Sequence, residues 1–160
     1  MGFALLPLIV LAFFGGLNAM ERSHAEGLLP PSIVSRATQQ GQAFISYRNA
    51  VVVYQQNNPA FTGTVSNTAL ATQGLKSSAE FLALASNSIT AVGVSGRVIT
   101  AYAALTPGAL RVARDLTEND GSLGMASGSS WSSVSPGSIL VPLATTVPNG
   151  SVVSVIQIGN

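Results

Sequence analysis

The chain has 160 residues, with seven basic and six acidic side chains and a formal net charge of +1 at neutral pH. Charged residues make up 8% of the chain, against about 25% in typical soluble domains, and they form no basic stripe or cluster. This argues against nucleic acid or an anionic lipid surface as the partner. There is no cysteine, which excludes disulfides, thiolate metal sites and a cysteine nucleophile.

Residues 2–20 contain no charged side chain and are mostly Leu, Ile, Val, Phe and Ala. As an α-helix this run reaches about 28 Å at ~1.5 Å per residue, close to the ~30 Å hydrocarbon core of a bilayer. It predicts a transmembrane anchor over residues 1–20, with residues 2–20 in the lipid bilayer. The alternative is a signal peptide cleaved after Ala19 or Ala25, although no Lys or Arg precedes the apolar run.

Small residues in this run are spaced for close contact between membrane helices. Such pairs, four positions apart, let two backbones approach, although small residues are also common in spans without that role. The pairs are Ala12 with Gly16 and Gly15 with Ala19. A polar hinge over residues 21–31 follows, and it carries the only histidine, His24.

From Ser32 onward the apolar residues recur at spacings of three, four and seven, which predicts an amphipathic helix of about 26 residues, or ~39 Å. Asn57, Asn58 and Pro59 predict its end. The expected apolar face comprises Val34, Ala37, Gly41, Phe44, Ile45, Val51 and Val52. The expected polar face comprises Arg36, Gln39, Gln40, Gln42, Arg48 and Gln56.

Shorter elements follow this helix. Ser66 is expected to cap a short helix that runs through Thr72. Residues 79–85 fit a helix or a strand. Residues 89–94 and 97–103 are rich in β-branched side chains and predict the two strands of a hairpin.

A further helix is predicted after Thr106, an N-cap candidate that is followed by Pro107 at the first helical position. Leu105 and Leu110 are expected to form a hydrophobic staple across this cap. The expected buried face comprises Ala109, Leu110, Ala113 and Leu116. The expected ion pairs are Arg111 with Asp115 and Arg114 with Glu118.

Residues 121–138 are rich in Ser and Gly and predict a loop around Trp131, with a short strand near residues 123–126. Residues 139–143 and 152–158 predict two more strands. The whole pattern predicts an α+β fold, with an N-terminal transmembrane helix, a long amphipathic helix, then an antiparallel sheet with one further capped helix. The expected domains are an anchor at residues 1–20, a hinge at residues 21–31 and a small extracytoplasmic domain at residues 32–160.

No set of side chains predicts catalysis, a cofactor or a metal ion. The lone His24 lacks the partners of a Ser-His-Asp relay and the further ligands that zinc requires. Lys76 beside Ser77 and Ser78 permits a Ser-Lys dyad, but in a serine-rich chain this spacing arises by coincidence. The carboxylates near the second helix predict a solvated helix face, and they are Asp115, Glu118 and Asp120.

Aromatic and Arg side chains are favoured at binding hot spots. Five such residues are candidates for contact with a partner protein: Tyr47, Arg48, Tyr54, Phe61 and Trp131. The alternative is that the rings pack under the sheet while Arg48 pairs locally. Trp131 is then expected to pin the Ser/Gly-rich loop to the domain.

Several segments resemble the small PilM proteins of type IVb and conjugative thin pili, and the similarity covers nearly the whole chain. It includes the Leu-rich helix after Thr106-Pro107-Gly108. The other segments are Tyr47-Arg48-Asn49-Ala50, residues 58–65 (NPAFTGTV), residues 69–71 (ALA), the Ser-Pro-Gly loop at Ser135 and residues 148–153 (PNGSVV).

The resemblance implies a single-pass protein of the bacterial inner membrane with a periplasmic domain and no catalytic residues, which contacts other pilus-assembly proteins. Self-association of the chain is left open. A pilin-like minor subunit of the pilus is an alternative, although no basic leader precedes the apolar run and Pro7 stands where a pilin has Glu. A secreted or tethered hydrolase that uses a serine is a second alternative, and it lacks a credible base.

Overall fold

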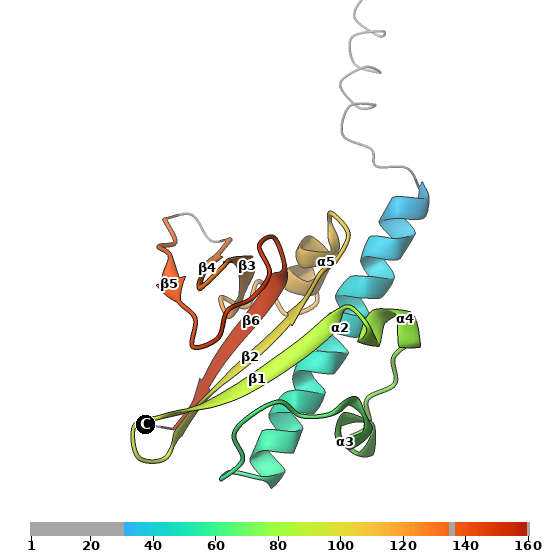
Figure 1. The fold of residues 1–160 in the computed structure, drawn as a ribbon. Helices are drawn as coiled ribbons and strands as arrows, with labels where there is room; N and C mark the ends of the chain where they lie inside the picture. The colour runs from blue at the N-terminus through green and yellow to red at the C-terminus, as the bar shows by residue number, and fades with distance from the viewer. Residues whose placement is uncertain (1–30, 135–136, 160) are drawn as a thin grey trace, which may run out of the picture. The chain divides into compact units, whose positions relative to one another are not determined.

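The computed structural model describes residues 31–134 and 137–159 (Figure 1). The predicted anchor, with Ala12, Gly15, Gly16 and Ala19, lies outside the described residues, and so does His24. Within the described residues, none of the helices combines the length and the apolar character needed to cross a membrane. The helices are α2 (Pro31–Asn57), α3 (Asn67–Thr72), α4 (Ala79–Leu82) and α5 (Ala109–Asp115). The strands are β1 (Ala85–Val92), β2 (Gly96–Ala103), β3 (Leu123–Ser127), β4 (Ser130–Ser133), β5 (Val141–Pro142) and β6 (Val152–Ile158).

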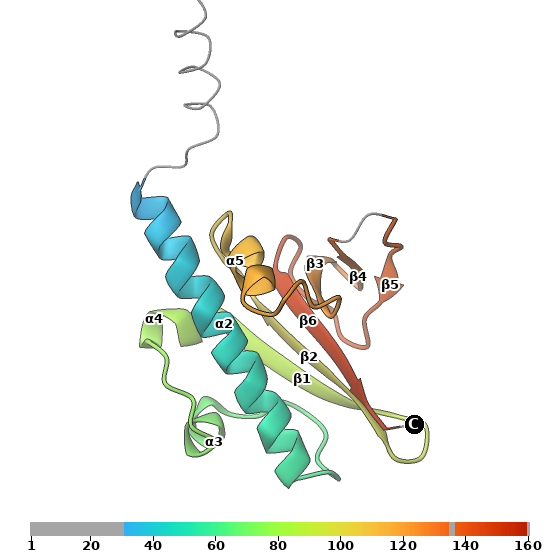
Figure 2. The ribbon, with the colours of Figure 1, turned by 180° about the vertical axis from the view of Figure 1, so that it is seen from behind.

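The six strands form one antiparallel sheet in the order β1-β2-β6-β3-β4-β5. The last strand, β6, therefore lies in the middle of the sheet, where it pairs with β2 and β3. Helix α2 crosses one face of the sheet, and α3 and α4 lie beside it (Figure 2). This arrangement confirms the predicted α+β fold with an antiparallel sheet.

The strands agree with the sequence patterns where β-branched residues are dense. The β1–β2 hairpin and β6 are confirmed, but β1 begins at Ala85 rather than Ile89 because its first residues pair with the end of β2. Strand β4 was not predicted. Its sequence is Ser-Trp-Ser-Ser, and it exists because β3 and β5 pair with it on either side. Strand β5 is shorter than the predicted strand at residues 139–143.

The core fills the space between α2 and the sheet. Phe44, Tyr47 and Val51 of α2 are buried in one cluster with Ile89 and Ile99. Each such side chain contributes about 1.5–3 kcal/mol when it is fully buried, so this face holds the helix to the sheet. The predicted apolar face is wrong at Val34, which is exposed because the first turns of α2 extend past the sheet (Figure 1).

Helix α5 starts later than predicted, and Thr106 is not its N-cap. The helix begins at Ala109, after Gly108 with a left-handed φ of +92°. The Thr106 N–H and hydroxyl instead donate to Gln40 Oε1, at 2.7 and 2.9 Å. An amide oxygen of α2 therefore binds the group that was expected to cap the helix, and Gln40 is buried rather than on the predicted polar face.

The outer side of α5 also differs from the prediction. Arg111 lies 4.0 Å from Asp115, as expected. The predicted pair of Arg114 with Glu118 is absent from the ion pairs of the described residues, because α5 ends at Asp115 and Glu118 has a φ of +53°. Leu116 follows the last helical residue and is exposed rather than buried.

Candidate protein-interaction surface

Tyr47 joins three parts of the core and is only 1% exposed. Its hydroxyl accepts a hydrogen bond from Asn87 Nδ2 at 2.7 Å. Asn87 also accepts from the Val65 N–H at 2.8 Å and donates to the Val65 carbonyl at 3.0 Å. Burial raises the pKa of Tyr47 above its ordinary value of 10.0, against the opposing effect of the Asn87 hydrogen bond. Through Asn87, Tyr47 is thus linked to β1 and to the segment before α3.

Arg48 pairs within the domain. Its Nη1 donates to Asp120 Oδ2 at 2.7 Å, and the two side chains are 12% and 33% exposed. Burial acts to raise the pKa of Asp120, but the Ser122 N–H and the Arg48 guanidinium more than offset it, so that pKa lies below its usual 3.8. This agrees with the alternative that Arg48 pairs locally. Asp120 therefore differs from Asp115 and Glu118, which are exposed.

Tyr54 and Phe61 form an edge-to-face aromatic pair near the end of α2. Their ring centroids lie 5.2 Å apart, with an angle of 85° between the rings. Both rings pack against the edge of the core and remain half-buried. Contact between these residues and a partner protein stays a prediction.

Trp131 belongs to β4 and is 8% exposed. It packs in a second apolar cluster with Ala126, Val147 and Val153. The ring thus holds the β3–β4 hairpin to the rest of the sheet, in the part of the chain that was predicted to be a loop. The Trp131 Nε1 atom is buried without a hydrogen-bond partner among the described residues.

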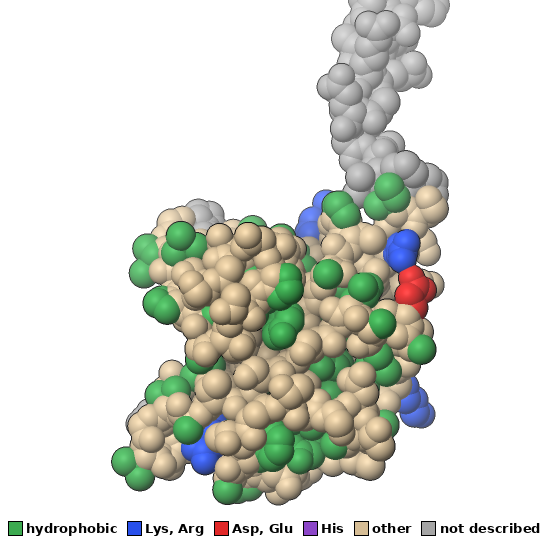
Figure 3. Space-filling view, in the orientation of Figure 1, with side chains coloured by type: hydrophobic (Ala, Val, Ile, Leu, Met, Phe, Trp, Pro, Cys, Tyr) green, Lys and Arg blue, Asp and Glu red, His purple; other side chains and the backbone are tan. Residues whose placement is uncertain are grey.

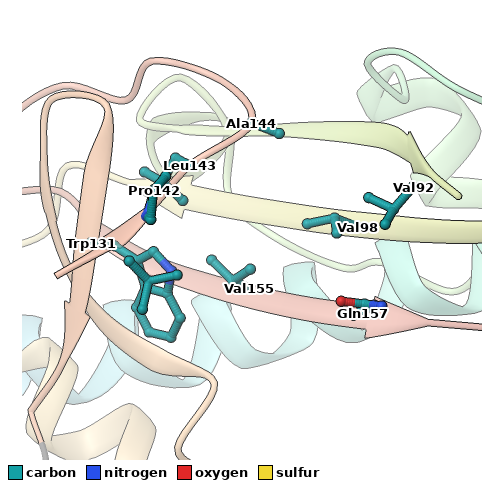
Figure 4. Close-up of a pocket in the computed structure, with 9 residues that line it drawn as sticks. Val92, Val98, Trp131, Pro142, Leu143, Ala144, Val155 and Gln157 are labelled. Carbon is teal, nitrogen blue, oxygen red and sulfur yellow. The ribbon is translucent and has the colours of Figure 1, made fainter. Parts of the chain in front are cut away.

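A groove of about 450 Å³ opens beside Trp131 on the face of the sheet opposite α2. Trp131, Pro142 and Leu143 lie at one end of it, while Val98 and Val155 extend along its floor (Figure 4). Val98 and Val155 face away from α2 because they alternate with Ile99 and Ile156 of the core. The side chains that line the groove include no charged group.

The sequence patterns did not predict this groove, because its lining comes from strands that are distant in sequence. One signal was nevertheless present. Residues 121–160 contain no Asp, Glu, Lys, Arg or His, and most of the groove lining comes from this stretch. A long charge-free segment in a folded domain therefore indicated a neutral surface.

The described residues contain no group of three or more acidic or histidine side chains that could hold a metal ion. Ser78, one of the two serines beside Lys76, is the N-cap of α4 and accepts a hydrogen bond from the Phe81 N–H at 3.2 Å. The groove and the half-buried aromatic pair are two features of the described residues that could contact other molecules.

Comparisons with known proteins agree with the residues quoted above for a family resemblance. The family model PilM matches residues 10–155. A crystal structure of PilM from Escherichia coli B7A has a similar fold, with a TM-score of 0.57 and 17% sequence identity, over 81% of this chain and 98% of that chain. No protein with curated function matches the chain.

Proposed function

The chain belongs to the PilM family, which makes it a pilus-related protein, and we propose that it is a membrane-anchored, non-catalytic component of a type IVb or conjugative thin-pilus assembly apparatus. In this proposal residues 2–20 cross the bacterial inner membrane once. The domain lies in the periplasm and contacts other pilus-assembly proteins there.

The observation that carries this proposal is the extent of the family match. Residues 10–155 include the second half of the apolar run as well as almost all of the domain, so the match extends from within the predicted anchor through the folded part. A role through contacts is supported by the charge-free groove. Arg48 and Asp120, which carry charge in the folded part, are paired with one another within the domain.

Deletion and complementation test the pilus role and the anchor together. We expect the deletion strain to lose its pili, counted by electron microscopy, and the wild-type gene to restore them. An Arg at the centre of a span costs about 2.5–3.5 kcal/mol on insertion scales, so Ile9→Arg should fail where the matched control Ile9→Leu succeeds. Normal piliation without the gene would contradict the pilus role, and restoration by Ile9→Arg would contradict the anchor.

Fractionation and intact mass separate the proposal from its alternatives. The full-length mass in the inner-membrane fraction is expected. A protein shortened after Ala19 or Ala25 would show a cleaved signal peptide instead. Recovery of the chain in sheared pili would show that it is a pilin-like subunit.

A further inference from the structure

Two apolar features of the domain lie next to one another. One is the groove, and the other is the β5 arm, defined here as residues 137–142. Ile139 and Leu140 of the arm are 77% and 64% exposed, and Val141 and Pro142 continue directly into the groove lining. In Figure 3 apolar side chains gather on the lobe around β5, and the surface is hollowed between this lobe and the end of the β1–β2 hairpin.

The occupant of the groove should be neutral and apolar. A charged side chain placed there would lose its hydration without gaining a counter-charge, because the groove lining has none. Arg97 precedes Val98 on β2 and so points to the opposite face of the sheet. The arm fits the requirement, since its exposed residues are aliphatic and residues 121–160 carry no charge.

The edge of the sheet at β5 is not suited to the addition of another strand. The Leu143 N–H donates inward, to the Ser129 carbonyl, so the neighbouring position faces the open side. That position is Pro142, which has no backbone N–H and so cannot donate a hydrogen bond to an added strand. The exposed side chains of Ile139 and Leu140 are therefore the apolar groups that this edge presents.

We propose that the chain forms a two-fold dimer in which the β5 arm of each copy fills the groove of the other. A two-fold contact uses the same patch on both copies, and here one continuous patch supplies both the inserted side chains and the cavity that receives them. The contact covers Ile139 and Leu140 and fills the groove at the same time. This proposal does not depend on the pilus role.

Disulfide trapping in the full chain tests the proposal, because the chain has no cysteine of its own. Leu140→Cys and Val98→Cys chains that carry different tags are co-expressed and oxidised. We expect a covalent dimer containing both tags. The matched control replaces Val98→Cys with Leu116→Cys, which is also exposed but lies after α5, and this pair should give no cross-link above background.

The native mass of the detergent-solubilised full chain provides the second measurement. We expect twice the monomer mass for the wild type and for Leu116→Asp, and the monomer mass for Ile139→Asp and Leu140→Asp. These residues are exposed, so the substitutions should leave the fold intact. A monomeric wild type, equal cross-linking through Leu116→Cys, a dimer that survives both arm variants, or cross-linking to a different protein would overturn the proposal.

Discussion

Asn87 donates a hydrogen bond to the hydroxyl of Tyr47 at 2.7 Å, although the two residues are 40 positions apart in the chain. The bond ties the middle of α2 to β1 inside the core. Asn87 also accepts a hydrogen bond from the Val65 N–H and donates one to the Val65 carbonyl. The side-chain amide of this β1 residue therefore connects α2 with the segment before α3. Buried polar groups are costly without partners, so this small network is expected to influence stability strongly.

Tyr47→Phe should lower the free energy of unfolding by about 1–2 kcal/mol, because the Asn87 amide loses one of its acceptors in the core. Asn87→Ala should cost more, since it also removes the partners of Val65. Urea unfolding measures both effects. Tyr54→Phe is the control, because no hydrogen bond of its hydroxyl occurs in the described residues and its ring is half-buried. A Tyr47→Phe protein as stable as wild type would show that this bond contributes nothing.

Alkaline pH should destabilise the wild type relative to Tyr47→Phe. The folded-state pKa of Tyr47 is raised by burial, so the unfolded state releases the phenolic proton first as the pH rises. The stabilising effect of the neutral hydroxyl is complete below about pH 10 and is lost above it. The difference between the two proteins in urea midpoint should therefore narrow as the pH increases beyond 10, and a constant difference would contradict this mechanism.

Acid should remove the contribution of the Arg48–Asp120 pair. The pKa of Asp120 is lowered in the folded state, so its stabilising effect is present above the unfolded value near 3.8 and is lost as the pH falls through the lower folded value. Asp120→Asn should cost up to about 1 kcal/mol at pH 7, since the pair is partly exposed to solvent, and progressively less as the pH falls below 3.8. Asp115→Asn is the control, because Asp115 pairs with Arg111 on the exposed surface and its replacement should have a smaller effect on stability. Equal effects at both positions would contradict the assignment.

Gln40→Ala should destabilise the domain by about 1–3 kcal/mol, because the Thr106 N–H and hydroxyl would both lose the same acceptor. Gln39→Ala changes the neighbouring residue on the exposed side of the same helix and should stay within about 0.5 kcal/mol of wild type. Thermal unfolding of the two variants gives the comparison. Similar melting temperatures for both would show that the Gln40 contact is not needed.

Gly41→Ala should be destabilising even though Ala favours a helix interior by about 1 kcal/mol. An added Cβ at Gly41 would lie 2.8 Å from the Ala109 carbonyl oxygen and from Val112 Cβ, so α5 would have to move away from α2. Overpacking of this kind typically costs about 1–3 kcal/mol. Ser46→Ala, on the exposed side of α2, should be neutral or slightly stabilising. A stabilised Gly41→Ala protein would mean that the two helices separate easily.

Local patterns in the sequence determined the elements that form through near neighbours. The apolar spacing from Ser32 to Asn57 predicted α2, and the β-branched run at residues 152–158 predicted β6 with the observed ends. Ser66 caps α3 as predicted, because its hydroxyl needs only the N–H of Ala69, three residues away. These features depend on hydrogen bonds and periodicities within a few residues, which the sequence displays directly.

Only the tertiary structure decided which distant residues meet. Strand β6 inserts between β2 and β3, and this pairing creates the sheet face on which Val98 and Val155 meet Trp131 to form the groove. Thr106 was expected to cap α5, but it donates to Gln40 instead, because α2 and α5 pack closely at Gly41. Arg48 likewise forms its ion pair with Asp120, which is 72 positions away in the sequence. Such contacts depend on how the chain returns to itself, which no local pattern specifies.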